Sequence, residues 1–155
     1  MLQIDLHHGP RDELAPLFAE ADDSESEIAS YCELGDVLVA RNGGTIVGLA
    51  LVLDHAEEGS FELKSLAVDE AWRSRGIGAA LVAAVAEECR RRGGHRLLVA
   101  TAAASIGALQ FYQRQGFRFR RIIRDHYTSD RGYRPLELNG IALLDEVILD
   151  LELRA

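Results

Sequence analysis

One segment constrains the fold of this chain more than any other: a strand, a basic loop and a long helix follow one another between residues 61 and 94. Apolar residues recur through 61–68, which predicts a strand, and residues 72–75 carry two arginines. From Ile77 to Cys89 apolar residues recur every three or four positions, as in an amphipathic helix. Three arginines and two glycines then predict the end of this helix.

The turn into this helix has the composition of an anion-binding site. Gly76 and Gly78 allow a ligand to approach the main chain, and the first N–H groups of a helix carry partial positive charge. A Walker loop would require Gly-Lys-Ser/Thr, which is absent here. A Rossmann fingerprint would require a small residue in place of Leu81 and an acid about 20 residues later, near Arg96. An ordinary glycine-containing turn remains the alternative interpretation.

The strand before the turn has an irregular pattern. Phe61 and Leu63 are apolar at odd positions, whereas Leu66 and Val68 are apolar at even positions, so the alternation slips near Ser65. A β-bulge would produce this slip by placing two residues opposite one. A fully buried strand, which needs no alternation, is the other interpretation.

The remaining elements are expected on both sides of this segment. Ser24, with Glu27 three residues later, has the spacing of a capping box. Asn42-Gly43-Gly44 lies between two apolar runs, which indicates a hairpin. The expected strands are 2–6, 37–40, 45–53, 97–100, 117–125 and 141–151, the last of which also fits a helix, and the expected further helices are 11–21, 24–34 and 105–115.

Length and composition predict a globular protein. A chain of 155 residues is expected to form one domain, residues 1–155, because domains usually contain roughly 100–200 residues. A hydrophobic content of 48% and a charged content of 27% are ordinary for such a chain. No apolar run approaches the roughly 18 residues of a membrane span. The first six residues do not resemble a signal peptide, so we expect a cytoplasmic protein without a membrane partner.

Cysteine and histidine spacing predicts no metal site. Cys32 and Cys89 form no Cys-x-x-Cys or Cys/His motif, and the five histidines are scattered. Cys89 falls in step with Leu81 and Val85 on the long helix, which favours core packing over a reactive role.

Charge is distributed unevenly along the chain. The net charge of −8 argues against a nucleic-acid partner, because phosphate binding needs excess cations. Residues 12–36 contain nine acids and no Lys or Arg, whereas residues 90–134 contain eleven arginines. The acidic part would suit a cationic ligand and the basic part an anionic one if these charges converge in space. Two solvated faces are the alternative.

The basic loop and the second amphipathic helix carry two motifs. Arg73-Ser74-Arg75-Gly76-Ile77-Gly78 has the pattern Gln/Arg-x-x-Gly-x-Gly/Ala. The run from Ser105 to Tyr112, followed by Gly116-Phe117, has the pattern Asn-x-x-Ala-x-x-hydrophobic-Tyr ending in Gly-Phe, with Ser105 where Asn is commoner. In both motifs the chain resembles the GCN5-related N-acetyltransferase (GNAT) superfamily, over roughly residues 36–119.

This resemblance implies an α/β (α+β) GNAT fold, in which a bent, mixed sheet of six or seven strands has flanking helices and its splayed central strands bind acetyl-CoA. Loop 73–78 would hold the pyrophosphate, and the backbone of Leu66 and Val68 would pair with the pantetheine arm like an added strand. A bulge near Ser65 would open such a gap. The cofactor-binding residues expected on this basis are Leu66, Ala67, Val68, Arg73, Ser74, Arg75, Gly76, Ile77, Gly78, Ser105 and Tyr112.

The reaction implied is direct transfer of acetyl from acetyl-CoA to a primary amine, without a metal. An alkylamine has a pKa of about 10.4, so a base must take its proton. Glu62 matches the general base of the histone-acetylating branch, and a surface residue paired with Lys64 or Arg41 is the alternative. Tyr112 matches the family's tyrosine, which would protonate the departing thiolate, and a core aromatic residue is the alternative.

The resemblance leaves the acceptor and the class of activity open. In the family the acceptor lies between the first two helices and the loop before the last strand, here residues 12–36 and 125–139. The acidic segment favours a cationic small molecule or peptide. A catalytically silent acyl-CoA-binding regulatory module is the alternative function. Homodimers are frequent among relatives, and the sequence does not decide between a monomer and a homodimer.

Overall fold

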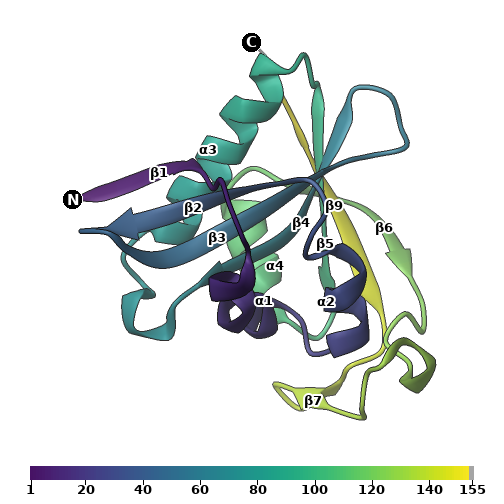
Figure 1. Cartoon of the computed structure of the whole chain (residues 1–155). Coiled ribbons are helices and arrows are strands. Elements are labelled where there is room, and N and C mark those ends of the chain that lie inside the picture. Colours follow the sequence, from purple (N-terminus) through teal and green to yellow (C-terminus); the bar gives the residue numbers. More distant parts are fainter. Residues whose placement is uncertain (154–155) are drawn as a thin grey trace.

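The computed structural model describes residues 1–153, and a seven-stranded sheet forms its centre (Figure 1). The strand order is β1-β2-β3-β4-β5-β9-β6, and all neighbours are antiparallel except β4 and β5, which are parallel. The strands of this sheet are β1 (Leu2–Leu6), β2 (Asp36–Asn42), β3 (Thr45–Asp54), β4 (Ser60–Val68), β5 (Arg96–Ala102), β6 (Arg118–Ile123) and β9 (Glu146–Glu152). A separate hairpin consists of β7 (Glu137–Leu138) and β8 (Ile141–Ala142).

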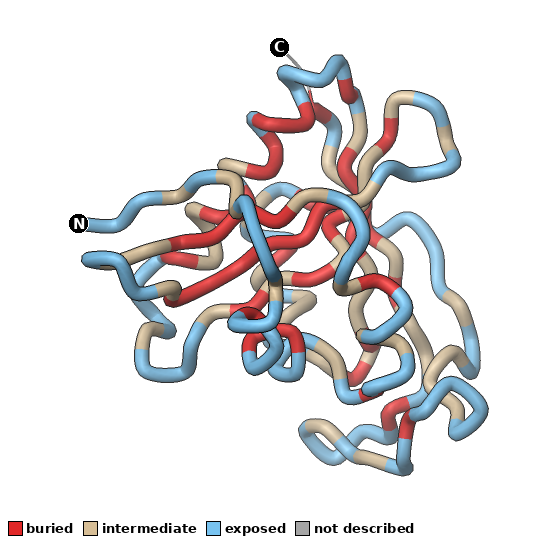
Figure 2. Tube along the Cα trace, in the orientation of Figure 1, coloured by how far each residue is buried: buried red, intermediate tan, exposed pale blue. Residues whose placement is uncertain are grey.

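Helices lie on both faces of the sheet. The α-helices are α1 (Ala15–Ala21), α2 (Glu25–Tyr31), α3 (Ile77–Arg91) and α4 (Ile106–Arg114). Three short 3-10 helices are η1 (Asp12–Leu14), η2 (Glu70–Trp72) and η3 (Ser129–Arg131). Successive residues of β2 face opposite sides, so Val37 and Val39 pack with α1 and α2, whereas Leu38 and Ala40 pack with α3 and α4. Buried residues are therefore concentrated along the central strands and the inner faces of the helices (Figure 2).

Most of the predicted elements are confirmed. The strand at Leu2–Leu6 and the hairpin of β2 and β3 are present, and the Ser24 hydroxyl accepts a hydrogen bond from the Glu27 amide at 3.2 Å. The expected helix at 11–21 divides into η1 and α1, with a proline in the first turn of α1, where its missing N–H is tolerated. The prediction of a single element at 141–151 is wrong, because this part of the chain contains two separate strands, β8 and β9. Neither of them is helical.

The centre of the sheet splits where β4 and β5 separate. Their pairing covers only the four residues from Ser60 to Leu63, while β5 continues to pair with β9 as far as Ala102. Leu51 pairs with Ser65 and the next residue of β3 pairs with Leu63, which leaves Lys64 as the extra residue of a bulge in β4. The bulge expected near Ser65 is thus confirmed, and it lies where β4 leaves β5.

Candidate active site

The unpaired half of β4 presents main-chain groups to the gap. Asp69 N–H donates to Val47 O at 2.8 Å, so these two residues form a hydrogen-bonded pair of the antiparallel strands β3 and β4. From this pair toward the start of β4, non-hydrogen-bonded and hydrogen-bonded pairs alternate. Leu66 and Val68 fall in the non-bonded pairs and direct their N–H and C=O groups away from β3, toward the side where β5 has diverged. These groups are suited to bind an extended ligand as an added strand, which is the arrangement that the family resemblance implies.

The turn between β4 and α3 exposes further N–H groups. Ser74 and Gly76 have φ angles of 63° and 80°, both in the left-handed region. Gly76 is the N-cap of α3 and provides no side-chain hydrogen bond, and no acidic residue lies in the first turn. The first intrahelical bond is donated by Ala80, so the preceding N–H groups are available to an anion at the positive end of a 15-residue helix.

A groove between this turn and α4 brings most of the predicted cofactor-binding residues together. Its volume is about 820 Å³. Leu66, Ala67, Val68, Arg73, Ser74, Gly76, Ile77, Gly78 and Ser105 line it, whereas Arg75 and Tyr112 do not. We call it the α3–α4 groove. Its size and uncapped amides fit a ligand that combines an elongated chain with phosphates.

Sequence reasoning missed one wall of this groove. Ala108, Phe111 and Arg114 from α4 line it, together with Trp72, Ala79 and Gly107. The spacing of 108, 111 and 114 places these residues on one helical face, and this periodicity was the signal that could have found them. Gly78 lies against this wall, because a Cβ atom there would stand 3.3 Å from the Phe111 ring. Arg114 adds a cation to the groove.

The two arginines of the basic loop have different surroundings. Arg73 lines the groove, where its Nε donates to Val68 O at 3.1 Å and its Nη2 pairs with Glu20 of α1 at 2.8 Å. The Arg75 guanidinium stacks over the Trp72 ring, 4.6 Å from its centroid. Only Arg73 is therefore directed to the groove in this arrangement.

Tyr112 lies in the core beneath the groove. It is 9% exposed and packs edge-on against Phe111 and Phe117. Burial raises the pKa of its hydroxyl, so the phenol stays protonated at neutral pH. A proton donor is the role that this protonation state allows.

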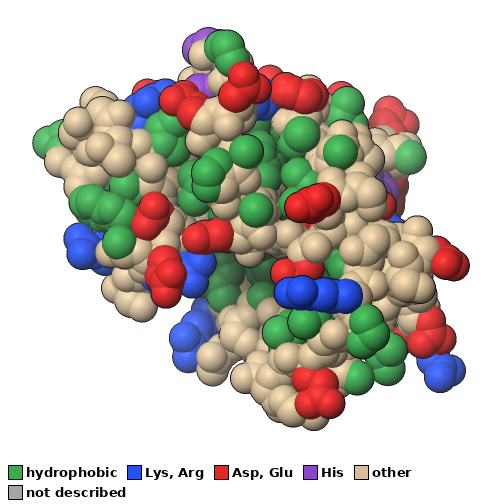
Figure 3. Space-filling model, turned by 60° about the horizontal axis from the view of Figure 1, so that its bottom comes forward, with side chains coloured by type: hydrophobic (Ala, Val, Ile, Leu, Met, Phe, Trp, Pro, Cys, Tyr) green, Lys and Arg blue, Asp and Glu red, His purple; other side chains and the backbone are tan. Residues whose placement is uncertain are grey.

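A second cavity, of about 260 Å³, lies beside the first and shares Ser105 with it. It lies where the ends of α1 and α2 meet β4, β5, the start of β9 and the loop after β6, and Figure 3 shows Asp and Glu side chains around a hollow in this face. Six acids line it, against one lysine and one histidine: Glu20, Asp22, Asp23, Glu27, Glu62 and Glu146, with Lys64 and His126. We call it the acidic cavity. It unites the two segments, 12–36 and 125–139, that the sequence predicted to meet.

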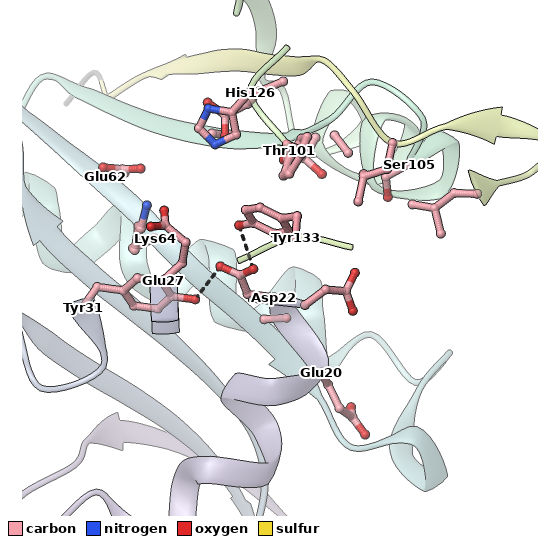
Figure 4. A pocket seen from close by; sticks show the side chains of 18 residues that line it. Glu20, Asp22, Glu27, Tyr31, Glu62, Lys64, Thr101, Ser105, His126 and Tyr133 are labelled. Carbon is pink, nitrogen blue, oxygen red and sulfur yellow. Dashed lines mark hydrogen bonds and ion pairs between the residues drawn. The ribbon is translucent and has the colours of Figure 1, made fainter. Parts of the chain in front are cut away.

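Two tyrosines hold Asp22 in the acidic cavity (Figure 4). Tyr31 donates to Oδ2 at 3.1 Å and Tyr133 donates to Oδ1 at 2.8 Å. Burial is the main cause that raises the pKa of Tyr31, and the negative charge of Asp22 raises it further. The pKa of Tyr133 is raised by burial and then by its hydrogen bond to Asp22. Within residues 1–153, no Lys, Arg or His lies within 4.0 Å of the Asp22 carboxylate. Hydrogen bonds therefore stabilise this charge, and it remains available to a cation.

On the opposite wall, His126 and Glu146 form a half-buried pair with Nε2 and Oε2 3.1 Å apart. Burial is the main cause that lowers the pKa of His126, and the positive charge of Arg131 lowers it further. Burial is also the main cause that raises the pKa of Glu146. Arg131 Nη1 donates to Nδ1 of this histidine at 3.2 Å and pairs through Nη2 with Glu27. His126 in its neutral form then donates from Nε2 to Glu146.

Glu62 lines the acidic cavity from β4, two residues before the bulge. Neither Lys64 nor Arg41 lies within ion-pair distance of it in the described part of the chain, so the alternative of a surface ion pair is not what the structure contains. Its carboxylate is directed toward the cavity in which an acceptor would lie (Figure 4).

The described residues offer few candidates for a metal site or a catalytic thiol. Among residues 1–153, no group of three or more His, Cys, Asp or Glu side chains is arranged to hold a metal ion. Cys89 is fully buried in α3 and lines neither the groove nor the acidic cavity. Burial raises the pKa of its thiol to about 11. The same described stretch contains no helix long and apolar enough to cross a membrane.

Comparison with known sequences and solved structures found similar proteins. A model of the Acetyltransferase (GNAT) family matches residues 6–117. The uncharacterized N-acetyltransferase YvbK of Bacillus subtilis (strain 168) is 31% identical over 156 residues, covering 98% of this chain and 97% of that protein. A GNAT family acetyltransferase from Elizabethkingia anophelis, solved with acetyl-CoA bound, superposes with a TM-score of 0.90 at 28% identity over 98% of both chains.

A Bacillus subtilis acetyltransferase solved in complex with CoA has a TM-score of 0.89 at 30% identity, over 99% of this chain and 100% of that one. The family and the fold expected from the two motifs are confirmed, and so is acetyl-CoA-dependent acetyltransferase activity. The chain belongs to the GNAT family of acetyltransferases.

Proposed function

We propose that this enzyme transfers acetyl from acetyl-CoA directly to a primary amine on a cationic small molecule or peptide. One observation carries the proposal: the α3–α4 groove, with its anion-binding turn, meets the acidic cavity at Ser105. The groove would take an anionic donor and the cavity a cationic acceptor. The two reactants would then meet at the gap between β4 and β5.

On the donor side, the amides at the start of α3 and the Arg73 guanidinium would bind the pyrophosphate. The main chain of Leu66 and Val68 would bind the pantetheine arm, and its N–H groups near Val68 would stabilise the oxyanion. The fit rests on N–H groups without a cap and on main chain that faces no neighbouring strand, where Val68 O accepts a hydrogen bond from Arg73 Nε.

On the acceptor side, the acids of the cavity would attract an ammonium or guanidinium group. Glu20, Glu27 and Glu146 already have Arg or His partners, whereas Asp22 is held by two neutral hydroxyls. Asp22 is therefore the acid best placed to bind a positive charge of the acceptor that is distant from the reacting amine.

For the chemical step, Glu62 would take the proton of the acceptor amine, directly or through water. The amine would attack the thioester carbonyl, the C–S bond would break, and the Tyr112 hydroxyl would protonate the departing thiolate. The high pKa of the Cys89 thiol and its distance from both cavities support direct transfer over an acetyl-cysteine intermediate.

The test measures thiol release from acetyl-CoA with a panel of neutral and cationic amines, for the wild type and Tyr112→Phe. The proposal expects cationic amines to be preferred, salt to weaken the preference, and Tyr112→Phe to lower turnover while calorimetry shows unchanged CoA affinity. Equal turnover of neutral and cationic amines would contradict the acceptor class. Unchanged turnover of Tyr112→Phe would contradict the acid assignment, and CoA binding without turnover on any amine would favour the silent regulatory module.

A further inference from the structure

The acidic cavity contains an amine that belongs to the protein itself. Lys64 is the only lysine among 155 residues, and it lines this cavity from β4 (Figure 4). It is half-buried and is the extra residue of the bulge at which β4 leaves β5. The single side-chain amine of the chain thus stands where an acetyl acceptor is expected.

The direction of β4 places this amine next to the expected position of the thioester. The turn before α3 follows the carboxyl end of β4. The main-chain groups of Val68 and then Leu66, which face away from β3 and are not paired with β5, come next in the direction of the amino end of the strand. Lys64 lies two residues before Leu66, at the bulge, and its side chain faces Tyr31 and the acidic cavity. A strand rises about 3.3 Å per residue, so Lys64 begins about 7 Å beyond Leu66, within reach of a four-carbon side chain.

No ion pair holds the amine elsewhere. Within residues 1–153, no carboxylate lies within 4.0 Å of Lys64 Nζ, although six acids line the same cavity. Its contact with an aromatic ring is long: Nζ lies 5.1 Å from the centroid of Tyr31. A cation–π contact at a partly exposed site contributes only about 0.5–1 kcal/mol, so rotation of the side chain toward the gap costs little.

We propose that Lys64 is a modification site that the enzyme acetylates on itself when acetyl-CoA is bound and no acceptor occupies the acidic cavity. The inference depends on the donor side of the proposed function and not on the identity of the acceptor. A carboxylate of the cavity, Glu62 or Glu146, takes one proton from the Lys64 ammonium. The free amine attacks the thioester carbonyl, an N–C bond forms and the C–S bond breaks. The second proton of the attacking nitrogen passes to the departing thiolate, so CoA leaves as a thiol.

The products are N-acetyl-Lys64, CoA and one proton, so no further reactant is needed. Acetylation removes the only lysine charge from a cavity lined by six acids. The modified side chain is also longer and would occupy space that an acceptor needs. Self-acetylation is therefore expected to lower acceptor turnover.

The experiment incubates the full chain with acetyl-CoA alone and follows acetylated peptides by mass spectrometry. The α-amino group of Met1, a residue that is 98% exposed, is the internal reference for uncatalysed acetylation. In solution an α-amine, with a pKa near 8, is more often unprotonated than a lysine amine and reacts first. Lys64 is expected to react at least about tenfold faster than Met1, because binding converts a bimolecular step into an intramolecular one.

Two controls separate self-acetylation from other sources. The Lys64 rate is expected to saturate with acetyl-CoA and to be independent of protein concentration, and excess CoA is expected to protect Lys64 but not Met1. Lys64→Arg retains the positive charge and removes the nucleophilic amine. In this variant the peptide that contains residue 64 is expected to remain unacetylated.

A Lys64 rate equal to or below that of Met1, or one that excess CoA leaves unchanged, overturns the inference. If Lys64 stays unmodified while added amines are turned over, the inference fails and the proposed function stands. If CoA does not bind at all, both fail.

Discussion

The hydroxyl of Tyr133 donates a hydrogen bond of 2.8 Å to Oδ1 of Asp22, across 111 positions of the sequence. It connects the loop after β6 to the end of α1, and Tyr31 donates to the other oxygen of the same carboxylate. The Ser24 N–H also donates to Oδ1, and because all three donors are neutral, no cation lies beside Asp22 at the edge of the acidic cavity. The Tyr133 contact joins two segments that line this cavity.

Asp22→Asn removes that charge with little change in size. We expect the KM for a dicationic acceptor to rise about tenfold, since a charge-assisted hydrogen bond contributes roughly 1.5–3 kcal/mol. The affinity for CoA is expected to stay unchanged. Steady-state kinetics with saturating acetyl-CoA measure the change. Asp12→Asn is the control, because it alters net charge equally at an exposed residue that does not line the cavity. An equal rise in KM for both variants would show that overall charge, and not Asp22, attracts the acceptor.

Glu62→Gln tests the base. A positioned general base contributes typically about 10²–10⁴-fold, so kcat is expected to fall at least about 100-fold. Steady-state kinetics with saturating acetyl-CoA are the measurement, and Glu58→Gln, an exposed acid outside both cavities, is the control. A Glu62→Gln enzyme with wild-type kcat would mean that another group or water takes the proton.

Gly76→Ala tests the turn before α3. With φ at 80°, an L-residue at this position costs about 1–2 kcal/mol. We expect a lower free energy of unfolding and weaker CoA binding, because relaxation of the turn moves the amides at the start of α3. Gly107→Ala in α4 is the comparison: its added Cβ meets nothing within 4 Å, and helix propensity predicts a gain of about 0.5–1 kcal/mol. Urea unfolding and calorimetry measure the two effects, and an unchanged stability of Gly76→Ala would contradict the argument.

Cys89 predicts a loss of stability at alkaline pH. Its thiol has a pKa raised from 9.0 to about 11 in the folded protein. The folded state therefore favours the protonated thiol, and this stabilisation is present below pH 9 and is lost as the pH rises toward 11. The loss amounts to at most about 3 kcal/mol. Cys89→Ala is expected to be less stable at neutral pH because of the cavity it leaves, but to lose less stability between pH 9 and 11. Parallel pH curves for the two proteins would contradict this.

Local patterns were sufficient for most of the elements. Two apolar runs on either side of Asn42-Gly43-Gly44 predicted β2 and β3, and apolar periods of three and four predicted α3 and α4, because one buried helix face imposes those spacings. The slip of alternation near Ser65 predicted the bulge. It did not identify Lys64 as the extra residue, since that depends on the register against β3. Residues 141–151 were ambiguous, and strand pairing resolved them as two strands, β8 paired with β7 and β9 paired with both β5 and β6.

By itself, the sequence determined the glycine-containing turn before α3, the family, one acidic segment and one basic segment, because each is a short-range pattern of glycine, charge or helix start. Only the tertiary structure decided which charges meet. It brought Asp22 to Tyr133, Glu146 to His126 and Lys64 into the acidic cavity. It also placed Arg73 in the groove and Arg75 on Trp72, although both belong to one motif. Such contacts depend on strand order and loop closure over many residues, and no local spacing encodes a distance between segments that only the sheet holds together.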